Sequence, residues 1–443
     1  MRTPHFRGAP YPGVDELERQ ARALAALAPG VLRLRAVGES RAGRPLWLLS
    51  AGHGDRQFLT VAGAHANEPV GGASALRLAR LFARRPHHLQ LLGCTWHFLL
   101  CLDPDGAHLA QGWQPEEPEP SLEECHRSFY RPEFACQPES MPARGAGRRP
   151  LPESAALVRL LDELRPAAQF TLHGIEFGGG FVMLTRDVPG VADAFRRTAA
   201  RLRVPLVHHP LDGLDWRPEP PGVLVLPSGR GTGERDQSGF VAESTWLHPG
   251  RYGTLTALVE APAWAVAATG DPRPAADPAG ETARVSELLL DRTRQLTAVL
   301  DGRALDGVPE ELRPLRDAGL ELVDVSPSIA GTWAAEELPA HEGHFATLGV
   351  SARRVPLRAA AMLRRALART DPDAAETLGN LVHEWCQELR KSYDPRWVPV
   401  AVQSGLHLRT MLDTARLLGA EGGRTEGEYA EGGRTEGEYT EGG

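Results

Sequence analysis

The sequence lacks several features that would place the protein in other classes. No apolar run reaches the ~18 residues that a membrane-spanning helix needs, and the first residues, MRTPHFRGAPYPG, lack the apolar core of a secretory signal. The lysines and arginines form no basic stripe of the kind that binds nucleic acid. We therefore expect a cytoplasmic protein that binds neither membranes nor nucleic acids.

Cysteine is scarce, and the spacing of the cysteines does not indicate a framework of disulfide bonds. The five cysteines are odd in number and include no CxxC pair. This pattern is typical of a reduced, cytosolic protein with ordinary thiols. A bridge between Cys125 and Cys136 is an alternative that the missing export signal disfavours.

The 443 residues are too many for one ordinary domain. The net charge of −8 is uneven, because the segment 421–443 holds seven glutamates and only two arginines. This tail repeats the decapeptide EGGRTEGEY(A/T) without a large aliphatic residue, so we expect it to be disordered. A proline-rich stretch near residue 275, DPRPAADPAGET, marks a second change. We predict three parts: a first domain, a mainly helical C-terminal region and a disordered acidic tail, at 1–275, 276–419 and 420–443.

Strands and helices alternate in the first part. The runs FLTVAGAH, TWHFLLCLDPDG, AQFTLHG and TLTALVEAP are short and apolar, as buried parallel strands are. The segments VGGASALRLARLFARR and ESAALVRLLDELRP have helical periodicity, and VLRLRAVGESRAGRPLWLLSAG is typical of a hairpin. The pattern predicts an α/β fold with a mostly parallel mixed sheet and helices on both faces.

Each of the four predicted strands ends in a polar side chain. These residues are His65, Asp103, His173 and Glu260. In open α/β sheets, functional sites form beyond the carboxyl ends of the strands. We therefore expect these side chains to gather at one edge of the sheet.

The residue types at this edge predict a catalytic zinc site. His65 and Glu68 form a closely spaced pair of ligands, and His173 is the distant third ligand. Glu260 remains as a carboxylate that can take a proton from water and pass it to a leaving amine. Taken singly, His173 also fits a packing histidine and Glu260 a salt-bridge partner. The adjacent His208 and His209 are a possible alternative ligand pair, although neighbouring histidines rarely bind one ion together and a place at the rim is favoured.

Together these motifs resemble the zinc carboxypeptidases, the carboxypeptidase A-like metallopeptidases. GAHANEPVGG matches the family's histidine–glutamate motif, TLHG carries its second histidine, and LVEAP carries its general-base glutamate. LDPDG is similar to its Asn-Pro-Asp-Gly turn, with Asp103 in place of asparagine, and ESRAGRPLWLL resembles its Gly-Arg-Pro hairpin. The resemblance covers roughly residues 11 to 265.

The resemblance implies an α/β/α sandwich, one zinc ion per chain held by His65, Glu68 and His173, and hydrolysis of an amide bond with Glu260 as general base. It also implies that Arg127 and His126, in ECHRSFYRP, occupy the positions of an Asn-Arg pair that holds the substrate's terminal carboxylate.

The chain also departs from the family pattern. The arginine that polarises the scissile carbonyl should lie between the DPDG turn and Arg127, but AHLAQGWQPEEPEPSLEEC contains none. The substrate-contacting tyrosine is also missing from ERDQSGFVAESTWLHPG, and Tyr252 lies on the wrong side of a turn. Four arginines could replace the missing one, and the sequence does not rank them: Arg144, Arg148, Arg149 and Arg230.

Three functional hypotheses stay open. The first is a zinc metallocarboxypeptidase, a protease that cleaves the C-terminal amide bond of a peptide. The second is a deacylase of N-acyl amino acids that resembles aspartoacylase or succinylglutamate desuccinylase. The third is a catalytically degenerate binding module. The DPDG turn and the Gly-Arg-Pro hairpin favour the first hypothesis, and the missing arginine and tyrosine favour the third. The oligomeric state is left open.

Overall fold

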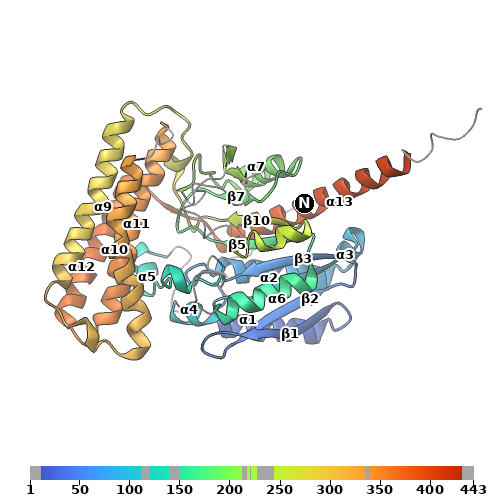
Figure 1. Cartoon of the computed structure of the whole chain (residues 1–443), viewed down its shortest axis with the longest axis horizontal. Helices are drawn as coiled ribbons and strands as arrows, with labels where there is room; N and C mark the ends of the chain where they lie inside the picture. The colour runs from blue at the N-terminus through green and yellow to red at the C-terminus, as the bar shows by residue number, and fades with distance from the viewer. Residues whose placement is uncertain are drawn as a thin grey trace, which may run out of the picture.

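The computed structural model describes residues 11–110, 120–139, 150–211, 217–219, 221–226, 244–335 and 340–431. A mixed sheet with helices on its faces forms one part of the molecule, and four long helices stand together at one end of it (Figure 1). The prediction of an α/β fold with a mainly helical C-terminal region is confirmed.

Within the described residues, the large sheet has nine strands in the order β1-β2-β4-β3-β5-β10-β7-β9-β8. Its central strands β4, β3, β5 and β10 run parallel, and antiparallel pairs lie toward both edges. Parallel pairing is therefore concentrated in the centre, together with the pair β7–β9. The strands are β1 (Leu32–Glu39), β2 (Pro45–Ala51), β3 (Arg56–Ala62), β4 (Cys94–Leu99), β5 (Ala168–His173), β7 (Phe181–Leu184), β8 (Arg217–Glu219), β9 (Val223–Val225) and β10 (Leu255–Glu260).

The alternation of side chains along β3 shows why both faces of the sheet are covered. Phe58 joins the larger core cluster, which α2 and α13 help to form, whereas Leu59 and Val61 join the cluster that includes α6. Successive residues of a strand point to opposite faces. Because every residue from Phe58 to Ala62 is buried, the strand needs apolar partners on both sides.

Helices on the two faces supply these partners. The helix α1 (Val14–Leu27) packs on α2 (Val70–Arg84), and α13 (Val400–Glu431) packs between α2 and α7 (Val191–Leu202). The helix α6 (Pro152–Leu164) packs against β1 in the second core cluster. Three short helices follow strands or loops in the same part: α3 (His87–Leu92), α4 (Pro104–Leu109) and α5 (Leu122–Arg127).

The helical region packs around its own core. Its long helices are α9 (Pro278–Leu300), α10 (Arg313–Ala335), α11 (Glu342–Leu367) and α12 (Pro372–Tyr393). Helix α11 is the central element, because it packs on α9, α10 and α12 and buries most of its length. A small sheet of β6 (Phe177–Gly178), β11 (Trp264–Ala265) and β12 (Arg396–Trp397) packs on this core through Phe177 and Trp264. The short 3₁₀ helices are η1 (Phe134–Cys136), η3 (His248–Tyr252), η4 (Ala267–Gly270), η5 (Leu305–Gly307) and η6 (Glu310–Leu312).

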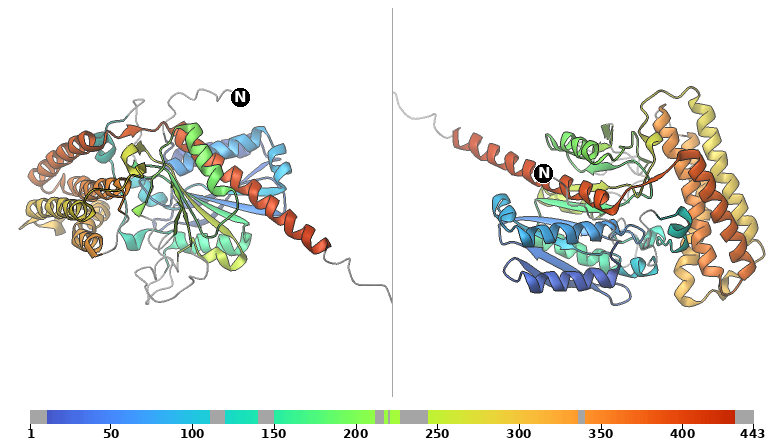
Figure 2. Two further views of the ribbon diagram at one scale, coloured as in Figure 1. Left: turned by 90° about the horizontal axis from the view of Figure 1, so that it is seen from above. Right: turned by 180° about the vertical axis from the view of Figure 1, so that it is seen from behind.

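Helix α13 returns from the helical region to the large sheet (Figure 2). Its buried residues Leu406 and Met411 belong to the core cluster of the sheet. The division of the chain at residue 275 stays a prediction. The last part of the segment 276–419 nevertheless packs on the predicted first domain, residues 1–275. Helix α13 also extends to Glu431, into the segment for which the sequence predicts disorder, and residues 432–443 lie outside the described part.

Two smaller predictions concern cysteines and membranes. None of the five cysteines forms a disulfide, so the alternative bridge between Cys125 and Cys136 is absent. Among the helices of the described segments, none combines the length and the apolar character needed to cross a membrane.

Candidate metal centre

The turn after β3 places the first two predicted ligands. Gly63 has a positive φ of 59°, and a Cβ atom on it would lie 2.8 Å from Sγ of Cys101. Only glycine suits such a close left-handed position. The turn then closes with a hydrogen bond from the backbone N–H of Glu68 to the carbonyl oxygen of His65, 3.1 Å long. Both side chains are buried as a result.

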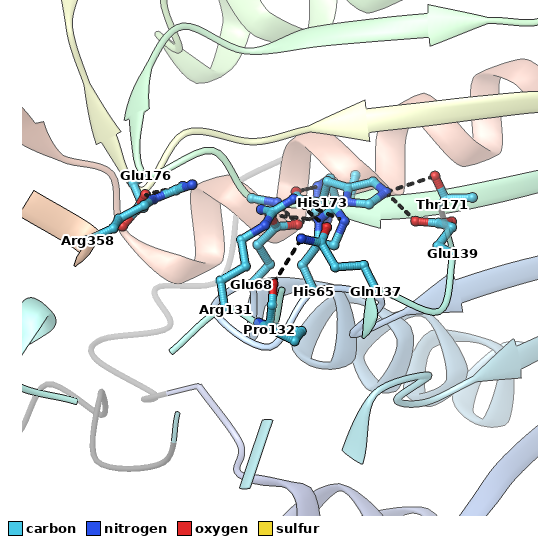
Figure 3. A network of polar contacts seen from close by, with 12 residues as sticks. His65, Glu68, Arg131, Pro132, Gln137, Glu139, Thr171, His173, Glu176 and Arg358 are labelled. Atoms are coloured by element: carbon cyan, nitrogen blue, oxygen red, sulfur yellow. Dashed lines mark hydrogen bonds and ion pairs between the residues drawn. The ribbon is translucent and has the colours of Figure 1, made fainter. Parts of the chain in front are cut away.

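His173 completes the group from the end of β5 (Figure 3). Nδ1 of His65 lies 2.9 Å from Oε1 of Glu68, and Nδ1 of His173 lies 2.9 Å from Oε2 of the same carboxylate. The two Nδ1 atoms are 3.2 Å apart. Ligand atoms at ~2.0–2.2 Å from a tetrahedral zinc ion are about 3.3 Å from one another. The donor set and its spacing therefore fit a zinc ion with little rearrangement.

Burial and mutual attraction shape the charges of these three side chains. Burial lowers the pKa of His65, and the nearby Arg131 lowers it further. Burial opposes the charge of Glu68, but His65 and His173 outweigh it and hold the pKa of Glu68 well below its usual range. Burial likewise opposes a charge on His173, but Glu139 and Glu68 raise its pKa well above the usual value. The carboxylate is thus ionised, as a metal ligand must be.

Further buried groups hold His173 from outside the ligand group. Its Nε2 atom lies 2.9 Å from Oε2 of Glu139 and 3.1 Å from Oγ1 of Thr171. The ring of His407, on α13, reaches the backbone carbonyl oxygen of His173 at 3.0 Å. A carboxylate on the far nitrogen of a histidine ligand orients the ring and raises its basicity. Glu139 is fully buried and lies where such a carboxylate belongs (Figure 3).

Glu260 enters the site through the sheet itself. It is the last residue of β10, and the parallel ladder pairs it directly with His173 on β5. Neighbouring strands lie about 4.7–4.9 Å apart, and paired residues leave the sheet on the same side. Glu260 is partly buried. The structure thus brings the predicted general base and the third predicted ligand to adjacent positions.

Arg131, like Glu139, is a site residue that sequence reasoning missed. Its Nη1 atom donates to Oε1 of Glu68 at 3.1 Å, and Nη2 lies 3.2 Å from Nε2 of His65. Nη2 also donates to Oε1 of Gln137 at 3.1 Å, which holds the guanidinium in place. The segment between the DPDG turn and Arg127 contains no arginine, and the arginine that reaches the ligands lies four residues beyond Arg127.

Arg127 and His126, the predicted substrate-binding pair, lie on α5 in different environments. Arg127 is exposed, and no hydrogen bond or ion pair among the described residues joins its side chain to the three ligands. His126 is buried and stacks on two aromatic rings. Its ring centroid lies 5.9 Å from that of Phe129 and 6.1 Å from that of Phe177. Its Nδ1 atom lies 2.8 Å from the carbonyl oxygen of Leu122. Their role in substrate binding stays a prediction.

Other predicted candidates lie elsewhere. Arg144, Arg148, Arg149 and Arg230 fall outside the described residues. Tyr252 donates a hydrogen bond of 2.9 Å to Asp162 of α6, away from the ligand group. Asp103 caps α4 by accepting from the N–H of Gly106 at 3.0 Å. It therefore shapes the turn beside the site and does not enter the ligand group.

A small cavity of about 60 Å³ opens beside His65 and Glu68. Leu17, Phe129 and Ala110 give it apolar walls, and Glu176 supplies a polar one. Glu176 is buried and accepts from Nε of Arg358, on α11, at 2.6 Å (Figure 3). The helical region therefore contributes a charged partner next to the candidate site.

A buried His–Glu–His group at the carboxyl edge of an α/β sheet, with a further carboxylate in register beside it, is typical of a metal-dependent hydrolase. Residues 17–175 match the family model described as zinc carboxypeptidase, which confirms the resemblance found in the sequence. The matched segment contains His65, Glu68 and His173 and ends before Glu260. The match to this family model supports a zinc-dependent hydrolase. The search of curated proteins found no match.

Several solved structures have weak similarity to this chain. One is a protein from Shewanella denitrificans described only provisionally as a metallopeptidase, with 16% identity, a TM-score of 0.39, and coverage of 56% of this chain and 81% of that one. A metallo-carboxypeptidase from Burkholderia cenocepacia has 15% identity, a TM-score of 0.38, and coverage of 56% and 60%. Bovine thrombin-activatable fibrinolysis inhibitor, in complex with tick carboxypeptidase inhibitor, has 13% identity, a TM-score of 0.35, and coverage of 56% and 86%. Similarity at this level carries no functional information about this chain.

Proposed function

We propose that the protein is a zinc-dependent hydrolase that cleaves the C-terminal amide bond of a peptide. The observation that carries this proposal is the group of two imidazole nitrogens and one carboxylate within 3.2 Å of one another, buried at the strand ends. His65, Glu68 and His173 would hold one zinc ion through Nδ1, the carboxylate and Nδ1, respectively. A zinc ion held there supplies Lewis-acid chemistry, lowering the pKa of a bound water and polarising a carbonyl group.

Glu260 acts as the general base of this reaction. Its carboxylate takes a proton from the attacking water and delivers it to the leaving nitrogen, so that the amine departs neutral. The register with His173 supports this assignment, because it holds the carboxylate beside a ligand through the backbone of two strands. A base positioned by a sheet needs no loop closure to reach its place.

Arg131 takes the role of the arginine that polarises the scissile carbonyl. In the described structure, Nε2 of His65 faces a guanidinium N–H of Arg131, so this nitrogen acts as an acceptor. A histidine that ligates through Nδ1 carries its proton on Nε2, which removes that acceptor. The guanidinium, which Glu68 and Gln137 continue to hold, would then turn the N–H that faced His65 toward a developing oxyanion. The exposed position of Arg127 favours Arg131 for this role.

The proposal is tested by substrate profiling of the intact protein with and without a chelator. Peptides that share one sequence but carry a free or an amidated C-terminus form one set, and N-acyl amino acids form the other. We expect loss of the C-terminal residue from the free peptides, with little cleavage of amidated peptides, and loss of activity in the chelator. His65→Ala serves as the control for contaminating peptidases.

Each other outcome of this experiment has a defined meaning. Preferential hydrolysis of the N-acyl amino acids assigns the protein to the deacylases and contradicts the carboxypeptidase proposal. A protein that binds zinc but hydrolyses neither set is a binding module. Activity that survives both the chelator and His65→Ala does not arise from this site.

A further inference from the structure

Four histidines gather at a second place, where the helical region joins the α/β part. His208 and His209 follow α7, whereas His341 and His344 lie at the start of α11, more than 130 residues later. The ring centroids of His208, His341 and His344 lie 4.9, 5.7 and 6.1 Å from that of His209, and His208 and His341 are 4.9 Å apart. The sequence analysis considered His208 and His209 as an alternative ligand pair and favoured a place at the rim, and the fold adds two further histidines beside them.

The two separations of 4.9 Å suit imidazoles that share one metal ion, and those of 5.7 and 6.1 Å are longer. With metal–nitrogen bonds of ~2.0–2.1 Å and tetrahedral angles, the ring centroids of two ligating histidines lie about 5 Å apart. Nδ1 of His208 and Nδ1 of His209 are only 2.8 Å apart, so these two nitrogens face each other. Among the described residues, no three of these histidines place ring nitrogens within 4.8 Å of one another, so ring rotations are needed to form the site.

The backbone around the histidines is fixed by hydrogen bonds to one shared segment. The backbone N–H of His208 donates to the carbonyl oxygen of Thr269 at 2.8 Å. The backbone N–H of Gly343 donates to the carbonyl oxygen of Asp271 at 2.9 Å. A Cβ atom on Gly343 would lie 2.7 Å from the carbonyl oxygen of Asp271. Glycine between the two α11 histidines thus permits the close approach that brings them to the 208–209 segment.

Two of the four side chains, those of His341 and His344, have buried ring nitrogens without the partners that such nitrogens usually have. His344 is only 5% exposed, and neither of its ring nitrogens has a hydrogen-bond partner among the described residues. Nδ1 of His341 is also buried and unpaired within that part of the chain. Buried polar groups are nearly always satisfied, and exceptions call for an explanation such as an ion that the structure does not hold.

The protonation states agree with ligand chemistry. Burial lowers the pKa of His344 to about 4, with further contributions from His209 and His341. Burial also lowers the pKa of His209 to about 4, and His208 and His341 add to the effect. Neutral imidazoles are the form that binds metals. His208, His209 and His341 are only partly buried, which leaves a path for an ion to enter.

We propose that His208, His209, His341 and His344 form a second metal site, which holds one divalent late transition metal such as Zn²⁺. An all-imidazole donor set selects zinc, copper or nickel over magnesium and calcium, which prefer oxygen ligands. The site has a structural role: a metal ion there joins the start of α11 to the segment after α7. It is independent of the His65–Glu68–His173 site and of the reaction proposed for that site.

Zinc content of the full-length protein, with any affinity tag removed, tests the proposal. The protein is equilibrated with buffered zinc and analysed by elemental mass spectrometry in a His65→Ala background, which empties the first site. We expect one zinc per chain in this background. We expect none after His209→Ala and His344→Gln are added, and one again when His87→Ala and His88→Ala are added instead. His87 and His88 are a matched control, because they are adjacent histidines with rings 4.4 Å apart on another helix.

Two further measurements cover the case in which the His344→Gln protein does not fold. Zinc should raise the thermal midpoint of the His65→Ala protein by several degrees, because a ligand that binds only the folded state stabilises it. Cobalt(II) added to the same protein should give the visible absorption of a four-coordinate site. The proposal is overturned if the folded His65→Ala protein binds no zinc, gains no thermal stability from zinc and gives no such absorption with cobalt(II). Peptidase activity is measured separately and does not enter this test.

Discussion

Glu260 is paired with His173 in the parallel ladder between β10 and β5. The two residues are the last of their strands, and both face the edge at which His65 and Glu68 lie. The backbone hydrogen bonds of a central sheet hold this pair, so its geometry does not depend on a flexible loop. A ligand and a base of one reaction are therefore positioned by the same structural element.

The first prediction separates metal binding from proton transfer. Glu260→Gln should bind zinc as the native protein does but should lose ~100- to 10,000-fold in kcat, the usual contribution of a general base. The amide keeps the size of the carboxylate but cannot accept the proton. Zinc stoichiometry and kcat on a cleavable peptide measure the two effects, and His173→Gln should lose both. A Glu260→Gln protein with native turnover would remove Glu260 from the mechanism.

The second prediction compares two neighbouring arginines. Arg131→Ala should lower kcat ~100- to 1000-fold, which is the usual effect of removing one oxyanion donor. Arg127→Ala is the matched control, since Arg127 is exposed and is four residues away. If Arg127→Ala raises KM strongly while Arg131→Ala is silent, the sequence-based assignment of Arg127 is correct and the role proposed for Arg131 is wrong.

The third prediction concerns the buried carboxylate behind His173. Glu139→Gln should weaken zinc affinity ~10- to 100-fold, because the charge that raises the basicity of the ligand is lost while the size is retained. Competition with a chromophoric chelator measures this affinity. Glu163→Gln, an exposed glutamate that pairs with Arg35, is the control and should have native affinity. Equal affinities for the two variants would exclude a role for Glu139 in metal binding.

Residues at strand ends were predictable from the sequence for a simple physical reason. Buried strands are short apolar runs, and their ends are marked by the first polar side chain, so His173 and Glu260 could be placed at one edge. His65 and Glu68 are close in sequence, and the local turn decides their geometry. Arg131 and Glu139 could not be placed, because the segment around them has no periodicity and its path depends on tertiary contacts.

A sequence pattern also does not predict which element a helix packs against. The segment around Leu406 and Met411 has apolar residues at helical spacing, which predicts a helix with one buried face. The same pattern suits a helix of the C-terminal bundle and a helix on the large sheet. Only the fold shows that these residues join the core of the sheet. The four-histidine cluster was hidden for the same reason, since its halves are far apart in the chain.

The last prediction concerns Asp103, which replaces asparagine in the family's turn. Its carboxyl group is fully buried, and burial raises its pKa to about 6, although the N–H of Gly106 and the guanidinium of Arg41 oppose the shift. The unfolded chain releases this proton near the ordinary pKa of 3.8. The folded state therefore holds a proton that the unfolded state has lost. As pH rises from about 4 to about 6, the free energy of unfolding should fall by up to roughly 3 kcal/mol through this group.

Asp103→Asn tests this directly, because asparagine can still cap α4 but does not titrate. Urea unfolding at several pH values gives the free energy of unfolding of both proteins, and their difference cancels the titration of other groups. Near pH 4 the two proteins should be similar in stability. By pH 7 the variant should be more stable by roughly 1–3 kcal/mol. The loss of the attraction between Asp103 and Arg41 reduces this gain. Stability curves that run parallel from pH 4 to pH 7 would show that Asp103 does not carry a buried charge that depends on pH in this range.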